Sequence, residues 1–109
     1  MDQHAIIIAD TNGVIQLWSA GAAALFGYPA KDAVGRKLDL VVPEKFRSAH
    51  WAGFGHAMNT GEAKADGTFF DAPVLCNGGA TRTFRGQLHV LRNENKKAIG
   101  AMAIFTAPR

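Results

Sequence analysis

Short apolar runs separated by turn residues predict the strands of a sheet. Residues 5–9 and 14–18 are apolar runs, and residues 10–13 between them read Asp-Thr-Asn-Gly. A turn of this composition between two such runs predicts a β-hairpin. Three further runs, residues 68–75, 82–91 and 98–106, are separated by Asn-Gly-Gly at 77–79 and by the polar loop 93–97. The chain therefore begins and ends with strands.

The segment between these two groups of strands has the pattern of helices. Ser19 is a helix cap before an alanine-rich stretch that ends at Gly27, and residues 29–34 form a short helical turn closed by Gly35. Residues 38–42 form an apolar bridge into a longer helix, with Pro43 as its first residue and Gly61 as its stop. The order strand-strand-helix-helix-helix-strand-strand-strand (β-β-α-α-α-β-β-β) predicts an antiparallel sheet in an α+β fold.

One face of the longer helix carries the most informative residue, His50. Phe46, His50, Gly53, Phe54 and Ala57 recur at helical spacing, so we expect them to share a face. An imidazole on an apolar stripe, with little bulk one turn later, is able to offer a nitrogen to a large flat molecule. The alternative is an ordinary core or surface histidine that is hydrogen-bonded to the backbone.

Composition and charge narrow the class of protein. A chain of 109 residues with 48% hydrophobic and 19% charged residues fits one globular domain, residues 1–109. No apolar run reaches the roughly 20 residues that span a bilayer. The single cysteine, Cys76, excludes an internal disulfide and is consistent with the cytoplasm. The net charge of +3 is scattered, so we expect neither nucleic acid nor membrane as a partner.

The motifs of common enzymes are missing from the sequence. It has no Gly-x-Ser-x-Gly, no phosphate-binding glycine loop, and no His-x-x-x-His or Cys-x-x-Cys spacing. We therefore expect a protein that is not an enzyme. Its signalling output would come from an unknown partner or from a longer chain of which this sequence is a piece.

Several short motifs resemble the PAS family of sensory domains. They are Asp-Thr-Asn-Gly-Val-Ile at 10–15, Ala-Ala-Leu-Phe-Gly-Tyr at 23–28, Val-Gly-Arg-Lys-Leu at 34–38, Val-Pro at 42–43 and Thr-Gly-Glu at 60–62. The resemblance covers nearly the whole chain. It implies a five-stranded antiparallel sheet with helices packed over one face and a pocket between them. Ser19 replaces the asparagine that many PAS domains have after the second strand, but both residues cap helices.

The third helix resembles a haem-binding subclass, the PAS domains of FixL-type oxygen-sensing kinases. The similar stretches are Pro-Glu-Lys-Phe-Arg-Ser-Ala-His at 43–50, Gly-Phe at 53–54 and Thr-Gly-Glu at 60–62. This resemblance implies a b-type haem with His50 as the ligand of the iron, and a homodimer that senses O2, CO, NO or a redox state. The residues expected around the haem are Phe46, His50, Gly53, Phe54, Ala57, Phe70, Leu75 and Leu88.

On the side of the haem where a gas would bind, opposite His50, the sequence differs from that of the oxygen sensors. The strand arginine with which the oxygen sensors bond oxygen corresponds to Phe70, and we expect an apolar lid of Phe69, Phe70, Val74, Leu75 and Leu88. Without a charged donor, the affinity for oxygen should fall relative to carbon monoxide or nitric oxide. Several roles stay open: Arg82 or Arg85 as a replacement donor, Met102 as a sixth iron ligand, and His56 as a contact of a haem propionate.

Two other interpretations stay open. One is a PAS module without a cofactor, which serves dimerisation or protein interaction or binds a small apolar ligand. The other is noncovalent flavin, although the cysteine that flavin photoreceptors of the LOV type need is missing from residues 43–50.

Overall fold

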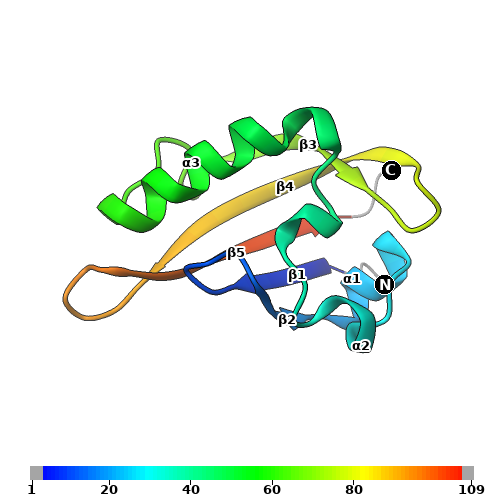
Figure 1. The fold of residues 1–109 in the computed structure, drawn as a ribbon, viewed down its shortest axis with the longest axis horizontal. Helices are drawn as coiled ribbons and strands as arrows, with labels where there is room; N and C mark the ends of the chain where they lie inside the picture. Colours follow the sequence, from blue (N-terminus) through cyan, green and yellow to red (C-terminus); the bar gives the residue numbers. More distant parts are fainter. Residues whose placement is uncertain (1–3, 107–109) are drawn as a thin grey trace.

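The sheet is the framework of the molecule. The computed structural model describes residues 4–106, and these form one antiparallel sheet of five strands in the order β2-β1-β5-β4-β3 (Figure 1). The strands are β1 (His4–Ala9), β2 (Ile15–Trp18), β3 (Phe69–Leu75), β4 (Thr81–Arg92) and β5 (Ala98–Thr106). The two predicted groups of strands thus meet where β1 pairs with β5.

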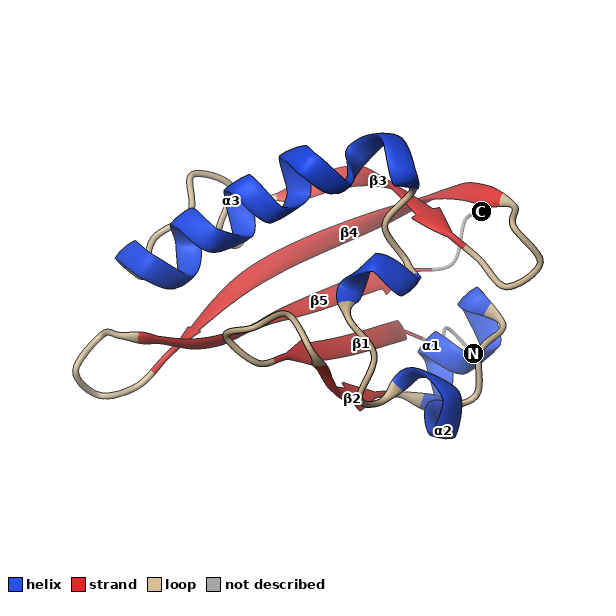
Figure 2. Cartoon of the chain, in the orientation of Figure 1, coloured by secondary structure: helices blue, strands red, loops and turns tan. Residues whose placement is uncertain are grey.

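The helices all lie between β2 and β3 in the chain, and Figure 2 shows them on one side of the sheet. They are α1 (Ala20–Phe26), α2 (Ala30–Ala33) and α3 (Arg47–Thr60), with two 3₁₀ turns, η1 (Leu38–Leu40) and η2 (Glu44–Phe46). The predicted α+β fold and element order are confirmed. No helix in residues 4–106 is long and apolar enough to cross a membrane.

Local signals in the sequence set the ends of the helices. The Ser19 hydroxyl accepts a hydrogen bond from the Ala22 N–H at 3.1 Å, as a helix cap does. Gly27 and Gly61 end α1 and α3 in the left-handed conformation, with φ of 87° and 76°.

The third predicted helix is divided in two. Pro43 leads into the 3₁₀ turn η2, and α3 begins only at Arg47. Phe46 lies at the junction with φ −104° and ψ −3°, and its side chain is 40% exposed. The prediction that Phe46 shares a face with His50 is wrong, because the tighter turn changes the angular spacing before α3 starts.

The core lies between the sheet and α1. The Phe26 ring packs edge to face on Phe84 and Phe105, at centroid distances of 5.1 and 5.6 Å. Ile7 and Ile15 are fully buried in the same cluster. In contrast, Ala57 is the one residue of α3 that is buried. The longest helix therefore does not pack tightly on the sheet, and a cavity separates the two.

Candidate ligand-binding cavity

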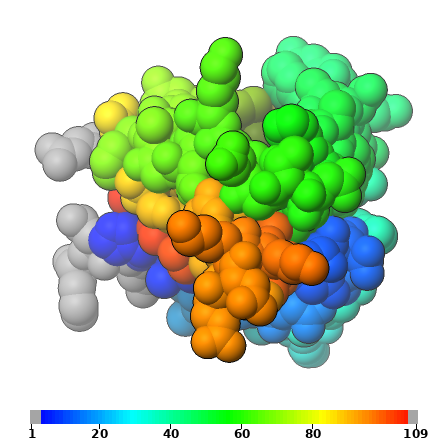
Figure 3. Space-filling view, turned by 90° about the vertical axis from the view of Figure 1, so that its left-hand side faces the viewer, coloured from blue at the N-terminus to red at the C-terminus, as the bar shows by residue number. Residues whose placement is uncertain are grey.

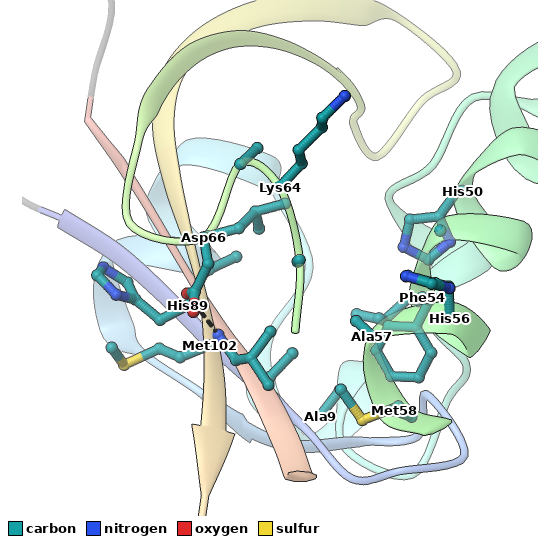
Figure 4. A pocket seen from close by; sticks show the side chains of 18 of the residues that line it. Ala9, His50, Phe54, His56, Ala57, Met58, Lys64, Asp66, His89 and Met102 are labelled. Carbon is teal, nitrogen blue, oxygen red and sulfur yellow. Dashed lines mark hydrogen bonds between the residues drawn. The ribbon is translucent and has the colours of Figure 1, made fainter. Parts of the chain in front are cut away.

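A cavity of about 500 Å³ lies between α3, the sheet and the segment that connects α3 to β3 (Figure 4). This volume is within the range of small-molecule sites, which is about 300–1,000 Å³. Its walls come from four parts of the chain: α3, the strands β1, β4 and β5, residues 63–66, and Leu38.

The sheet supplies an apolar wall. Ile7 pairs with Ala103, which also pairs with Leu88, so their side chains lie on the same face of the sheet. The cavity-facing side chains of this wall are Ile7, Ala9, Leu88, Val90, Ala101 and Ala103. None of these six carries a hydrogen-bonding group, and three are alanines, which leave room in front of the sheet.

α3 supplies the opposite wall. Four of the five residues that were predicted to share one face of this helix line the cavity: His50, Gly53, Phe54 and Ala57. The His50 and Phe54 rings stack with centroids 5.9 Å apart and planes at 27°. A Cβ atom built on Gly53 would have no neighbour within 4 Å, so this glycine faces open space.

The His50 imidazole has an unusual environment. Its Nδ1 atom is buried and has no hydrogen-bond partner in residues 4–106. Burial lowers the pKa of His50 below its ordinary value, and the nearby Asp39 carboxylate partly opposes this effect. The ring is therefore neutral at pH 7, which is the state of imidazole that binds metals.

Trp51 holds this part of α3 in place. Its indole N–H donates to the Asp39 carboxylate at 2.7 Å, and the side chain of Lys37 lies over its ring at 5.6 Å. The ring also fills the space in front of Gly13 in the β1–β2 turn. Trp51 does not line the cavity but a second, smaller hollow, to which Phe54 also contributes.

Polar groups gather at the rim of the cavity. His56 and Lys64 are exposed and lie among its lining residues. Figure 4 shows His56 on α3 and, across the cavity, Lys64 and Asp66 on the connecting segment. The Arg92 guanidinium donates to Asp66 and, with the Val90 N–H, holds the pKa of this carboxyl below its ordinary value. His56 and Lys64 are thus the groups at the rim that are able to meet an anionic end of a ligand.

The predicted apolar lid is mostly wrong, because residues of one strand alternate between the two faces of a sheet. Phe70 points to the helical face but packs against the core, and it does not line the cavity. Leu75, five residues on, points to the opposite face. Phe69 is 60% exposed and Val74 is buried in the core. Leu88 alone of the five lines the cavity.

The alternative ligands and donors also lie elsewhere. Met102 pairs with His89, one residue out of phase with the Leu88–Ala103 pair, so both side chains lie on the far face of the sheet (Figure 4). Both residues border the cavity, but the Met102 side chain points away from His50. Arg82 lies over the Phe84 ring, Arg85 lies over the Phe69 ring, and neither lines the cavity.

Sequence reasoning missed most of the sheet wall and residues 63–66. The signal for the wall was present in the alternation of Ala5, Ile7 and Ala9, and in the alanines of the last strand. Residues 63–66 have no apolar period, and their place depends on contacts with β4 that no local pattern encodes.

A bare metal ion has no site here: residues 4–106 contain no cluster of three or more His, Cys, Asp or Glu that could hold one. Haem iron is different, because the porphyrin supplies four of its ligands and the protein needs to supply one histidine.

Comparison with known proteins decides the family. The profile described as the PAS fold matches residues 2–107. The chain belongs to the PAS family. PAS domains are sensory modules of signal transduction, and the predicted fold is thereby confirmed.

One curated relative and two solved structures are similar to this chain. The PAS domain is 41% identical over 46 residues to the sensor protein FixL of Bradyrhizobium diazoefficiens, a match that covers 42% of this chain and 9% of FixL. A PAS domain from Colwellia psychrerythraea superposes with a TM-score of 0.77 at 20% identity, over 94% of this chain and 83% of that one. The PAS domain of the Cronobacter turicensis quorum-sensing receptor RpfR, in complex with BDSF, gives a TM-score of 0.74 at 16% identity, over 97% and 94% of the two chains. The chain spans about a tenth of the length of the curated relatives that it matches.

Proposed function

We propose that this PAS domain is a sensor that binds b-type haem in the cavity, with His50 as the ligand of the iron. The observation that carries the proposal is a neutral histidine with an unpartnered buried nitrogen, in an apolar cavity of about 500 Å³. The local identity to FixL supports it.

The residues of the cavity have distinct roles in this proposal. His50 offers its imidazole, and Phe54 holds the ring in place by stacking. Gly53 leaves space beside the helix, and the apolar sheet wall excludes water. His56 and Lys64 meet the carboxylates of the cofactor at the rim. The haem, when bound, supplies an iron centre that binds a diatomic gas or changes its oxidation state.

The sheet wall also sets the preference among gases. Its six cavity-facing side chains have no donor, and Phe70, Arg82 and Arg85 do not line the cavity. Oxygen depends more than carbon monoxide does on a donated hydrogen bond, since it accumulates negative charge when bound. The domain should therefore bind carbon monoxide or nitric oxide in preference to oxygen.

The absorbance spectrum after haemin titration tests the proposal. The wild-type protein should develop a Soret band at one haemin per chain, and His50→Ala should lose most of this affinity. His4→Ala is the matched control, because it removes an exposed histidine that does not line the cavity. A protein that stays colourless with haemin, or a His50→Ala variant with an unchanged spectrum, would contradict the proposal.

A second candidate is an apolar molecule with a carboxylate end and no metal. The apolar cavity with Lys64 at its rim supports it, and the similar RpfR domain binds a small ligand in its solved complex. A medium-chain fatty acid should then raise the melting temperature of the wild-type protein but not of Lys64→Glu. His50→Ala would leave this shift intact, which separates the two candidates. A flavin would instead give its own yellow absorbance in the purified protein.

The output of the sensor comes from outside this domain. We propose that the domain is a homodimer, without enzymatic activity of its own, that passes a change in the cavity to a partner or to another part of a longer chain. The partner is a signalling protein, and neither nucleic acid nor membrane is part of the proposal.

A further inference from the structure

The segment between α3 and β3, residues 62–67, forms a removable wall of the cavity. Ala63, Lys64, Ala65 and Asp66 all line the cavity from this segment. The segment has no helix or strand of its own. Its position therefore depends on the bonds that it makes to other parts of the chain.

These bonds go to the part of the β4 edge that β3 leaves unpaired. β3 pairs with β4 only as far as Phe69 opposite Gln87, so the last part of β4 extends beyond it. Residues 62–67 cover this edge. The Gly67 N–H donates to the Leu88 carbonyl at 2.7 Å, and the Val90 N–H donates to the Asp66 carboxylate at 3.0 Å (Figure 4, dashed line).

Arg92 ties the two ends of the segment together. Its Nη2 atom donates to Asp66 Oδ2 at 2.7 Å, and its Nε atom donates to the Gly61 carbonyl at 2.6 Å. Gly61 ends α3, and the β4–β5 loop, coloured orange, lies beside this end of the helix in Figure 3. One guanidinium thus connects the end of α3, the segment and β4.

We propose that Asp66 and Arg92 form a latch that holds residues 62–67 closed over the cavity, and that ligands enter and leave when the latch opens. The proposal rests on the proposed function only in that some ligand uses the cavity. Both side chains are partly exposed, Arg92 at 33% and Asp66 at 24%, so their pairing is screened by water and weak enough to open thermally. The bond from the Gly67 N–H to the Leu88 carbonyl and the bond from the Val90 N–H to the Asp66 carboxylate then reclose the segment on β4.

Hydrogen exchange of the ligand-free protein tests the latch. Asp66→Asn keeps an acceptor for the Val90 N–H but removes the charge, and Arg92→Gln removes the guanidinium. Both variants should raise the exchange rates of the Gly67 and Val90 amides, by up to about fivefold for a partly exposed pair. Asp71→Asn is the control, since it removes an equal charge from an exposed position on β3. Equal rates in all four proteins would overturn the proposal.

Thiol labelling tests whether the latch controls access. Ala57 lines the cavity and is 6% exposed, so a cysteine there reports entry of a reagent. In an Ala57→Cys, Cys76→Ala background, Asp66→Asn and Arg92→Gln should raise the labelling rate by the same factor as the exchange rate. Faster exchange with unchanged labelling would overturn the access role. Neither measurement uses a ligand, so a failure to bind haem contradicts the proposed function alone.

Discussion

Gly53 and Gly55 are two residues apart on α3, yet they face different spaces. A Cβ on either glycine would meet nothing within 4 Å, but Gly53 lines the cavity and Gly55 lines the smaller hollow beside Trp51. Glycine within a helix costs about 1 kcal/mol relative to alanine. Because both positions are glycine, a substitution at each one tests which of the two spaces a ligand occupies.

Gly53→Leu should fill part of the cavity without unfolding the protein. Overpacking of about 1–3 kcal/mol against a bound ligand corresponds to a loss of haemin affinity of about fivefold to a hundredfold. The free energy of unfolding of the ligand-free protein should rise or stay equal, because leucine is the better helix former. Gly55→Leu should leave haemin affinity unchanged. Titrations monitored by absorbance, with urea unfolding in parallel, measure both quantities, and equal losses in the two variants would place the ligand elsewhere.

The partly buried imidazole of His50 makes stability depend on pH. Folding lowers the pKa of His50, so below its ordinary value of 6.5 the unfolded chain binds more protons at this residue than the folded chain. The free energy of unfolding should therefore fall as the pH decreases through 6.5 towards the folded-state pKa, and the contribution is fully present above 6.5. His50→Gln should remove this part of the slope. Urea unfolding at a series of pH values checks it, and identical slopes in the two proteins would contradict a buried neutral His50.

At the scale of elements, Trp51 joins α3 to the β1–β2 turn. Gly13 has φ 77°, and a Cβ there would overlap the Trp51 ring. Gly35 also has a positive φ, 91°, but faces open space. Gly35→Ala should therefore cost about 1–2 kcal/mol from the backbone alone, whereas Gly13→Ala should cost about 1–3 kcal/mol more by displacing Trp51.

Thermal or urea unfolding of these two variants measures the difference. Because Trp51 and Trp18 are the two tryptophans of the chain, the fluorescence of Gly13→Ala should also change in a Trp18→Phe background. Equal destabilisation by the two alanines would mean that Trp51 moves freely, and that α3 is not anchored at this turn.

Elements could be predicted from the sequence where the signal is local. Ser19, Gly27 and Gly61 end helices by their own chemistry, and alternation defined the strands. The same reasoning placed His50, Gly53, Phe54 and Ala57 on one face. It failed for Phe46, because a 3₁₀ turn precedes α3. The family resemblance misplaced Phe70 and Leu75, because the strand residues that face the cavity are set by register with β4 and by packing against the core, and both of these are long-range.

At the scale of the whole molecule, the sheet face away from the helices is apolar near its centre. Ile6, Ile8, Met102 and Ile104 lie there in register on β1 and β5, and Leu17 beside them on β2 is 43% exposed. An antiparallel sheet with one solvated face normally alternates with polar residues on that face. A continuous apolar surface of this kind marks an interaction site, and a second copy of the same face would cover it in a symmetric dimer.

The proposed homodimer can be tested with a pair of matched charges. Leu17→Asp introduces a charge at the edge of this face. The dissociation constant of the dimer should rise tenfold or more, because dimerisation would then bury an unpaired charge. Val34→Asp is the control, since Val34 is 45% exposed but isolated on the helical side. Sedimentation velocity over a concentration series should give a dimer for the wild type and Val34→Asp, and a monomer for Leu17→Asp. If the wild-type protein is a monomer at high concentration, the proposed homodimer is wrong, and the output partner becomes the candidate that covers this face of the sheet.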